Sequence, residues 1–174
     1  MLKHIYRIIM IHIFNLFSGM HFWNIKRKIL NLIPDMSVGE NTRIVGPIWA
    51  GSVSKINIGS NTFVNRQFNV EGNGIVRIGD NVDIAPGVKI LTGGHCLGSK
   101  EHRAGEGISY KINIGEGCWI GAYSIIFGNT DIGNGCVVGA GTVVNKGFPP
   151  NTLIVGNAGT AKKSIDDLGG VIKR

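Results

Sequence analysis

The sequence predicts an all-β solenoid: a left-handed parallel β-helix of about five triangular coils, with an N-terminal helical segment and a short C-terminal tail. Three observations favour this fold. An aliphatic residue returns at every sixth position over long stretches, a period that fits neither a helix nor a strand. The register returns in blocks of three hexapeptides, and 27 of the 174 residues are glycine without any low-complexity tract. Hexapeptide coils of this kind are known to wind in the left-handed sense. The handedness is taken from that class, because no residue count reveals it.

The hexapeptides divide the middle of the chain into five coils of eighteen residues: 38–55, 58–75, 78–95, 114–131 and 132–149. Positions one and five of each hexapeptide carry no charged residue, so both are expected to point inward, where a charge would be strongly penalised. Position four often carries glycine or asparagine, which tolerate the positive φ that a corner needs. The corner residues predicted in this way are Asn41, Asn61, Asn81, Gly87, Gly117, Asn129, Gly135 and Gly141.

The chain is expected to form an N-terminal helical cap at 1–37, the β-helix at 38–149 with a loop at 96–113, and a C-terminal cap and tail at 150–174. Five basic residues and no acidic residue precede Asp35, and an apolar run at 8–17 is too short and too interrupted to span a membrane. Residues 1–33 are therefore predicted to form one or two helices, apolar on one side and basic on the other. Two compatible roles remain open: capping the solenoid, or lying on an anionic membrane surface.

Charge and cysteine content narrow the function classes. The formal net charge is +7, but beyond the basic head the charges nearly balance and no base-recognition motif is visible, so no nucleic-acid partner is expected. Cys96, Cys118 and Cys136 lack metal-ligand spacing, so neither a disulfide framework nor a metal site is predicted, and a reducing cytoplasmic location fits best. Cys118 and Cys136 both occupy position five, one coil apart, and are expected to stack as small buried residues.

The loop at 96–113 is the longest departure from the repeat, and His95 stands at its root in an outward position. A histidine titrates near neutrality and can accept a proton from a hydroxyl group, so His95 is the candidate general base. The adjacent Cys96 leaves open a ping-pong alternative with a thiolate nucleophile, although no activating partner is visible.

Ala122 and Ala140 occupy the same outward position one coil apart. Small side chains stacked there would leave a shallow track for an extended ligand, although small residues are equally well tolerated there without any function. Lys146, Lys162 and Lys163 lie near the C-terminal end of this track and suit either a phosphate-bearing ligand or a solvated surface.

The segments "TGGH" and "CWIGAYSIIFGNTDIGNGCVVGAGTVVNKGFPPNTLIVGN", together with the five coils, resemble the hexapeptide acyltransferase family over about residues 58–160. The nearest members are the galactoside, maltose and nodulation-type O-acetyltransferases and the related capsule, colanic-acid and O-antigen acetyltransferases. The resemblance implies transfer of acetyl from acetyl-CoA to a sugar hydroxyl without a metal, at a site between two subunits of a homotrimer.

The resemblance also assigns roles to individual residues. His95 matches the general base, Asn69 in "QFNVEG" resembles an asparagine near the acceptor, and Trp119 resembles an aromatic residue that lines the site. Asn69 and His95 fall on different edges of one prism, so one chain's Asn69 is expected to face the next chain's His95. The positions that match coenzyme contacts are Ala122 and Ala140 for the pantetheine arm, and Asn145 and Lys146 near the nucleotide end.

Two departures from the family pattern matter. The usual "GNPA" followed by a basic residue is replaced by "GNAGT" at 156–160, so Lys162 or Lys163 is expected to supply the missing cation. The segment between Asn69 and Ile78 is shorter than in the galactoside enzymes, so a second acceptor-binding acid cannot be placed and a simple galactoside is not expected.

The leading interpretation is an acetyl-CoA-dependent O-acetyltransferase that acts on a sugar hydroxyl in surface polysaccharide biosynthesis, by direct transfer with His95 as general base. Capsule, O-antigen and exopolysaccharide sugars all fit, and the basic head at 1–33 would bring a cytoplasmic enzyme to the inner face of the membrane. Three alternatives remain: N-acetylation of a nucleotide-linked amino sugar, a non-catalytic trimeric scaffold, and a drug-modifying acetyltransferase, although such enzymes tend to carry a larger excursion than 96–113.

Overall fold

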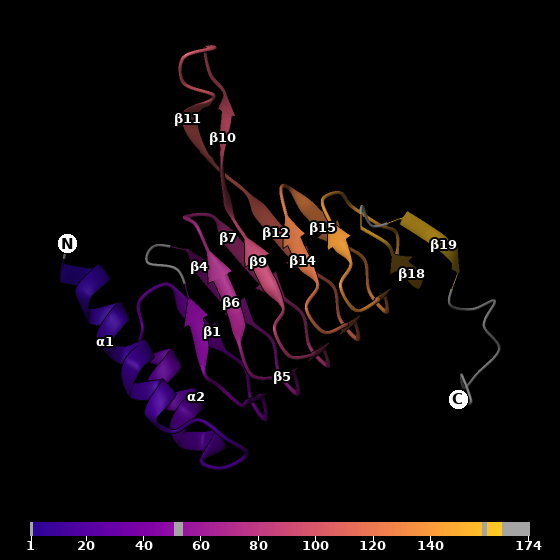
Figure 1. The fold of residues 1–174 in the computed structure, drawn as a ribbon. Coiled ribbons are helices and arrows are strands. Elements are labelled where there is room, and N and C mark those ends of the chain that lie inside the picture. Colours follow the sequence, from indigo (N-terminus) through magenta and orange to yellow (C-terminus); the bar gives the residue numbers. More distant parts are fainter. Residues whose placement is uncertain (1, 51–53, 158–159, 165–174) are drawn as a thin grey trace.

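A computed structural model describes residues 2–50, 54–157 and 160–164, the last range as backbone only. Two helices, α1 (Leu2–Leu16) and α2 (Trp23–Asn31), precede a solenoid whose three faces are parallel sheets (Figure 1). This arrangement confirms the predicted all-β parallel solenoid with a helical N-terminal segment.

Each turn of the solenoid adds one strand to each sheet. The first sheet contains β1 (Met36–Val38), β4 (Lys55–Ile58), β7 (Ile75–Ile78), β12 (Lys111–Ile114) and β15 (Thr130–Ile132). The second contains β2 (Arg43–Ile44), β5 (Phe63–Val64), β8 (Asp83–Ile84), β13 (Trp119–Ile120), β16 (Val137–Val138), β18 (Thr152–Val155) and the antiparallel β19 (Thr160–Ser164). The third contains β3 (Ile48–Ala50), β6 (Phe68–Glu71), β9 (Lys89–Leu91), β14 (Ile125–Phe127) and β17 (Val143–Val144). Five turns are complete, and β18 belongs to a sixth.

The core follows the predicted inward positions. Every residue at position one is buried, from Val38 to Val144. Position five is also buried in every coil except at Gly94, which is only half-buried because the chain has already turned away from the solenoid there. The two-residue insertions between coils lengthen the strands of the first sheet, and each adds a fully buried side chain, Ile56 or Val76.

Seven of the eight predicted corner residues have a positive φ, between 54° and 73°. The prediction for Asn129 was wrong, because the preceding Gly128 takes the positive φ (75°) at that corner. Glycine pays no steric penalty in this conformation, so the chain turns one residue earlier. The Asn129 side chain instead accepts a hydrogen bond from the Lys111 backbone N–H through Oδ1, at 3.0 Å.

The long excursion is a β-hairpin that rises away from the solenoid, formed by β10 (Gly93–Leu97) and β11 (Ala104–Ser109) (Figure 1). Its bounds differ from the predicted loop at 96–113 at both ends. The hairpin begins at Gly93, and residues 111–113 already belong to β12, where parallel pairing with β7 resumes. At its base the Tyr110 N–H donates to the Thr92 carbonyl at 2.7 Å, which ties the hairpin to the last buried residue before it.

The helices close the N-terminal end of the solenoid. Phe14 and Leu30 are fully buried against the first turn. The Asn15 side chain donates to the Ile48 carbonyl and accepts from its N–H, both at 2.9 Å, and Asn31 makes the same pair of bonds to Val38 at 3.0 and 2.7 Å. Because an open strand edge is a template for unwanted pairing, these amides give the helices a capping role. Neither helix is long and apolar enough to cross a membrane, and no other described helix is.

Candidate functional site

His95 lies in β10, exposed on the hairpin, where its backbone pairs with Gly107. Its Nδ1 atom is 2.8 Å from the carbonyl oxygen of Gly105 on the facing strand. A carbonyl oxygen only accepts, so Nδ1 must carry the hydrogen, and the lone pair of Nε2 is then free to accept a proton. Cys96 is exposed next to His95 on the same strand, at an irregularity in the strand register between His95 and Leu97.

Asn69 lies on the outward face of the third sheet, in register between Trp49 and Lys89. It lines a pocket of about 340 Å³ together with these neighbours and the residues Gln67, Phe68, Gly87 and Tyr123. The Oδ1 atom of Asn69 is buried and has no hydrogen-bond partner. A buried acceptor without a donor is costly, so this oxygen is suited to a donor from a ligand or from another chain.

Two residues of this pocket, Gln67 and Tyr123, occupy corners where glycine or asparagine would be usual. Both have a positive φ, 62° and 58°, and Tyr123 is 66% exposed. The Tyr123 ring lies against Gly87, where a Cβ atom would clash with it. Large side chains in this conformation are strained, and such strain concentrates at functional sites. The sequence analysis missed both residues, although the signal was present: position four of their hexapeptides lacks the expected residue type.

Ala122 and Ala140 lie one turn apart at the corner between the second and third sheets, half-buried and exposed respectively. The turns stack tightly here: the Gly141 N–H donates to the Ala122 carbonyl at 2.8 Å, and a Cβ on Gly121 would lie 2.5 Å from the Ala140 nitrogen. The two alanines therefore lie on closely stacked turns, as the predicted track requires. Tyr123, which lines the Asn69 pocket, directly follows Ala122.

The remaining coenzyme candidates lie C-terminal to this track. Asn145 and Lys146 are exposed just after β17, and the Lys146 ammonium lies 5.6 Å from the centroid of the Phe148 ring. Lys163 belongs to β19, where its backbone pairs with Leu153. Lys162 is its neighbour in the same strand.

Trp119 lies on the outward face of the second sheet and is 54% exposed. It lines a pocket of about 410 Å³ with Phe63, Asn65, Asp83, Ile84 and Ala85. This pocket shares no lining residue with the Asn69 pocket, and His95 lines neither of them. One protomer therefore presents His95, Asn69 and Trp119 from three separate places: the hairpin, the third sheet and the second sheet.

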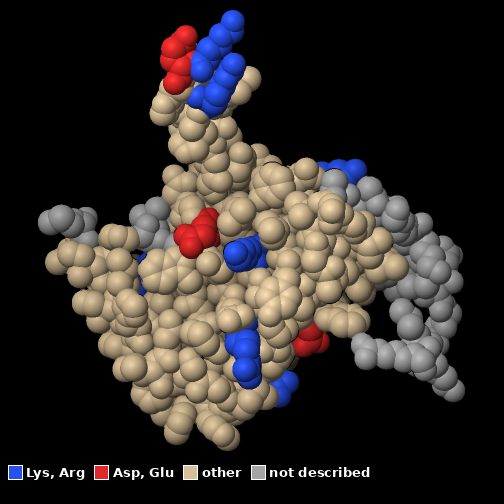
Figure 2. All heavy atoms as spheres, in the orientation of Figure 1, with Lys and Arg blue, Asp and Glu red and all other residues tan. Residues whose placement is uncertain are grey.

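Acidic and basic side chains lie together at the hairpin tip, and further charged side chains are spread over the solenoid face that Figure 2 shows. The tip sequence contains Lys100, Glu101 and Arg103. In contrast, the strand segment that carries His95, 93–97, contains no lysine, arginine or carboxylate residue.

Comparisons with known proteins agree with this architecture. Residues 111–146 match the family model described as bacterial transferase hexapeptide (six repeats). The chain is 36% identical over 139 residues to galactoside O-acetyltransferase of Escherichia coli K12, an alignment that covers 79% of this chain and 68% of that protein.

Two solved structures extend the likeness. A galactoside acetyltransferase in complex with coenzyme A matches with a TM-score of 0.83 and 30% identity, covering 95% of this chain and 82% of that one. A maltose O-acetyltransferase from Clostridium difficile 630 matches with a TM-score of 0.76 and 30% identity, covering 93% and 86%.

Proposed function

The chain belongs to the hexapeptide-repeat acetyltransferases, and from this premise we propose that it acetylates a sugar hydroxyl of a surface polysaccharide, with His95 as general base. The O-acetyltransferase relative and the coenzyme A held by the similar structure support an acetyl-CoA-dependent O-acetyltransferase. The observation that carries the role of His95 is the bond from Nδ1 to the Gly105 carbonyl.

In the proposed reaction, Nε2 of His95 takes the proton of the acceptor hydroxyl while the oxygen attacks the thioester carbonyl of acetyl-CoA. The resulting tetrahedral intermediate collapses with cleavage of the carbon–sulfur bond, and the coenzyme leaves as a thiol that receives the proton from the imidazolium. The acetyl ester of the sugar is the second product. One base serves both proton transfers, so a covalent intermediate on Cys96 is not needed.

The coenzyme is proposed to lie along the alanine track. The close stacking of Gly121 under Ala140 leaves a smooth corner against which the extended pantetheine arm fits. Asn145 and Lys146 are proposed to meet the nucleotide end, and Lys163 is proposed to supply the cation that the "GNAGT" segment lacks. The acetyl group would then lie toward Tyr123, at the entrance to the Asn69 pocket.

The acceptor sugar is proposed to occupy the Asn69 pocket. The unpartnered Oδ1 of Asn69 suits a sugar hydroxyl, and the exposed rings of Trp49 and Tyr123 offer apolar faces to a pyranose ring. Because neither this pocket nor the Trp119 pocket includes His95, the complete site is proposed to form in a homotrimer, where His95 of one protomer meets Asn69 of the next.

Exposed apolar side chains on the helices support contact with the cytoplasmic face of a membrane. In α1 they recur at helical spacing and form one stripe: Leu2, Ile5, Tyr6, Ile9, Ile13 and Leu16. Lys3 is exposed in α1 and Lys28 in α2, whereas Arg7 and Lys26 are buried, so the basic side expected for residues 1–33 is only partly present. An apolar helix face beside basic residues is the usual signature of a helix that lies in the membrane interface. This placement suits an enzyme whose glycan acceptor is assembled at the membrane.

The experiment is a coenzyme A release assay with the purified full chain, acetyl-CoA and a panel of sugars that carry free hydroxyl or amino groups. The proposal expects release that depends on a hydroxyl acceptor and an acetylated product that mild base hydrolyses. Acetylation restricted to amino groups would favour the amino-sugar alternative. If the chain neither releases nor binds coenzyme A, the proposal is wrong and a scaffold role gains support.

A further inference from the structure

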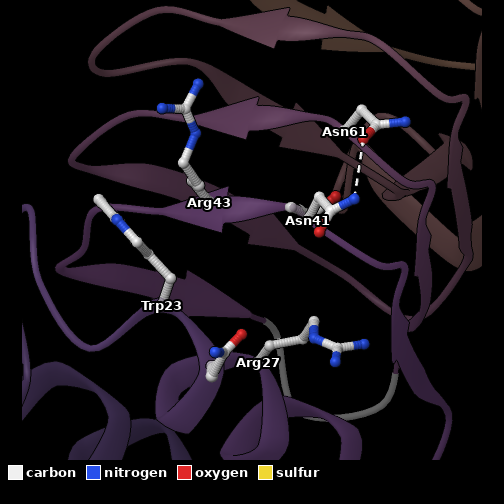
Figure 3. A pocket seen from close by; sticks show the side chains of 7 residues that line it. Trp23, Arg27, Asn41, Arg43 and Asn61 are labelled. Carbon is white, nitrogen blue, oxygen red and sulfur yellow. Dashed lines mark hydrogen bonds between the residues drawn. The ribbon is translucent and has the colours of Figure 1, made fainter.

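A third pocket, of about 460 Å³, lies between α2 and the first two turns of the solenoid, and we propose that it binds a phosphate group of the glycan acceptor. Trp23, Asn24 and Arg27 reach it from α2, and the solenoid contributes Asn41, Thr42, Arg43 and Asn61 (Figure 3). The proposal rests on the proposed function in one respect: it takes the acceptor to be a glycan.

The charge of the pocket favours an anion. None of its seven lining residues is acidic, and two are arginines. Within the described part of the chain, neither Arg27 nor Arg43 forms an ion pair with a carboxylate, and the contact made by the Arg43 guanidinium is to the Phe63 ring, 5.4 Å from its centroid. Guanidinium groups without a carboxylate partner are suited to phosphate, which they bind through charge-assisted hydrogen bonds.

A third cation lies behind the pocket wall. The buried Lys26 ammonium is 4.3 Å from the centroid of the Trp23 ring, and it donates to the carbonyls of Gly19 at 2.7 Å and Val45 at 3.1 Å. These contacts hold the positive charge close to the indole that lines the pocket. Asn41 and Asn61 add uncharged polar groups joined by a hydrogen bond of 3.3 Å, which suit sugar hydroxyls.

The two guanidinium groups lie well apart in Figure 3, with the Arg43 group near the indole of Trp23 and the Arg27 group on the other side. A single small anion therefore reaches one arginine at a time. A phosphate ester that also carries a sugar spans the opening and engages polar groups on both sides. The geometry predicts that a sugar phosphate binds more tightly than inorganic phosphate.

The second sheet connects this pocket to Trp119, the aromatic residue that the family resemblance assigns to the acceptor site. Arg43, Phe63, Asp83 and Trp119 are in register on four successive strands, so their side chains form one outward column. At the usual strand spacing, Arg43 and Trp119 are roughly 14 Å apart along this column. A glycan of a few sugars covers that distance. The pocket would therefore hold a phosphate located a few sugars from the hydroxyl that is acetylated.

A lipid headgroup presents the same phosphate chemistry, but the helix geometry favours a glycan. On α2 the exposed Ile25 lies on the opposite side of the helix from Trp23 and Arg27, judged by helical spacing. The pocket therefore opens away from the apolar side of α2, which is the side that would face lipid.

The test is isothermal titration of the full-length protein with glucose 1-phosphate, inorganic phosphate and glucose. We expect glucose 1-phosphate to bind most tightly and the Arg27→Gln/Arg43→Gln variant to weaken it by about tenfold or more. The Arg66→Gln/Arg77→Gln variant loses the same charge elsewhere on the solenoid and should bind normally. Asn24→Asp, which places an acid in the pocket without removing an arginine, should also weaken binding, and an acid in the first turn should not harm the helix.

The proposal is overturned if the two double variants bind glucose 1-phosphate equally well, or if the wild type does not bind it. It is also overturned if Arg27 and Arg43 are needed for affinity to phosphatidylglycerol vesicles while the sugar phosphate does not bind at all. Acetyl transfer to a short uncharged sugar should be unchanged in Arg27→Gln/Arg43→Gln. The titration does not require catalysis, so failure of the proposed acetyl transfer would be seen separately in the coenzyme A release assay.

Discussion

The imidazole of His95 is held by a backbone carbonyl rather than by a carboxylate: Nδ1 lies 2.8 Å from the oxygen of Gly105, across the hairpin. Both partners belong to paired strands, β10 and β11, so the pairing of the two strands of the hairpin orients the ring. Because the carbonyl is neutral, it selects the tautomer without adding a negative charge beside the base. The hairpin therefore positions the proposed general base, and is not simply a connection between turns.

This contact predicts the tautomer of the ring. In ¹⁵N NMR spectra of labelled protein above neutral pH, Nδ1 of His95 should appear protonated and Nε2 unprotonated. His102, at the hairpin tip, provides an internal comparison from the same hairpin. A dominant Nε2–H form of His95 would contradict the proposed proton acceptor, because the atom needed as base would already carry the hydrogen.

Replacing Tyr123 with glycine should make the fold more stable but weaken binding of the acceptor. Its φ of 58° is strained for an aromatic residue, so Tyr123→Gly should stabilise the fold by about 1 kcal/mol. The same change removes an aromatic face from the Asn69 pocket and should raise the KM for the acceptor more than it lowers kcat. Urea unfolding and steady-state kinetics on one preparation measure both effects.

Asn81→Gly is the matched control for Tyr123→Gly, because Asn81 has nearly the same φ (57°) and does not line the Asn69 pocket. It should leave the acceptor KM unchanged. If Tyr123→Gly behaves like this control in the kinetic assay, Tyr123 has no role in acceptor binding.

The three cysteines should react at very different rates. Cys96 is exposed, whereas Cys118 and Cys136 are buried, with each Sγ donating to a carbonyl at 3.2 Å. Burial raises the pKa of Cys118 to about 11 and also raises that of Cys136. A thiol reagent at neutral pH should label one cysteine rapidly and the other two only after unfolding. Rapid labelling of all three in the native protein would show that the coils around Cys118 and Cys136 open easily.

The buried Lys26 should make stability depend on alkaline pH. Burial lowers its pKa to about 8, below the usual 10.5, so the unfolded chain holds the proton more tightly than the folded chain. Unfolding free energy should therefore rise between about pH 8 and pH 10.5 through this group. Lys26→Met lacks this rise, so the stability difference between the wild type and Lys26→Met should increase from pH 7 to pH 10. A constant difference would show that the ammonium is not desolvated. Measuring the difference cancels the opposite contribution of Cys118.

The apolar stripe of α1 should direct membrane binding. Ile5 and Ile9 are about half exposed, so Ile5→Ser/Ile9→Ser should reduce sedimentation with vesicles of phosphatidylcholine and phosphatidylglycerol while leaving the melting temperature nearly unchanged. Leu97→Ser, which removes an exposed leucine from the hairpin, should not affect sedimentation. Equal sedimentation of all three proteins would mean that α1 does not contact the membrane.

Much of the fold could be predicted because the wall of the solenoid imposes a strict rule. Ile120 and Val138 recur at the same step and are buried as expected, because the same hexapeptide position points inward in successive turns. The start of the hairpin could not be predicted, because Gly94 has no side chain to indicate whether it points inward. The prediction of a positive φ at Asn129 was wrong for a related reason. Gly128 and Asn129 both tolerate a positive φ, and tertiary packing decides which of them adopts it.

The candidate site was only partly visible in the sequence. His95 stands out because it borders the longest interruption of the repeat. Ala122 and Ala140 stand out because they occupy the same outward position in successive coils. Tyr123 was missed because it lacks the glycine or asparagine by which a corner is recognised in the sequence. The pocket at Arg27 and Arg43 could not be foreseen, since it exists only where α2 packs on the second sheet, and no periodicity encodes that contact.

The most direct test of the central claim is the turnover of acetyl-CoA and an accepted sugar by His95→Ala, measured beside Cys96→Ser with the fold of each variant verified by circular dichroism. The account predicts a fall in kcat of about 10²-fold or more for His95→Ala and near wild-type turnover for Cys96→Ser. Near wild-type turnover in a folded His95→Ala protein would contradict it.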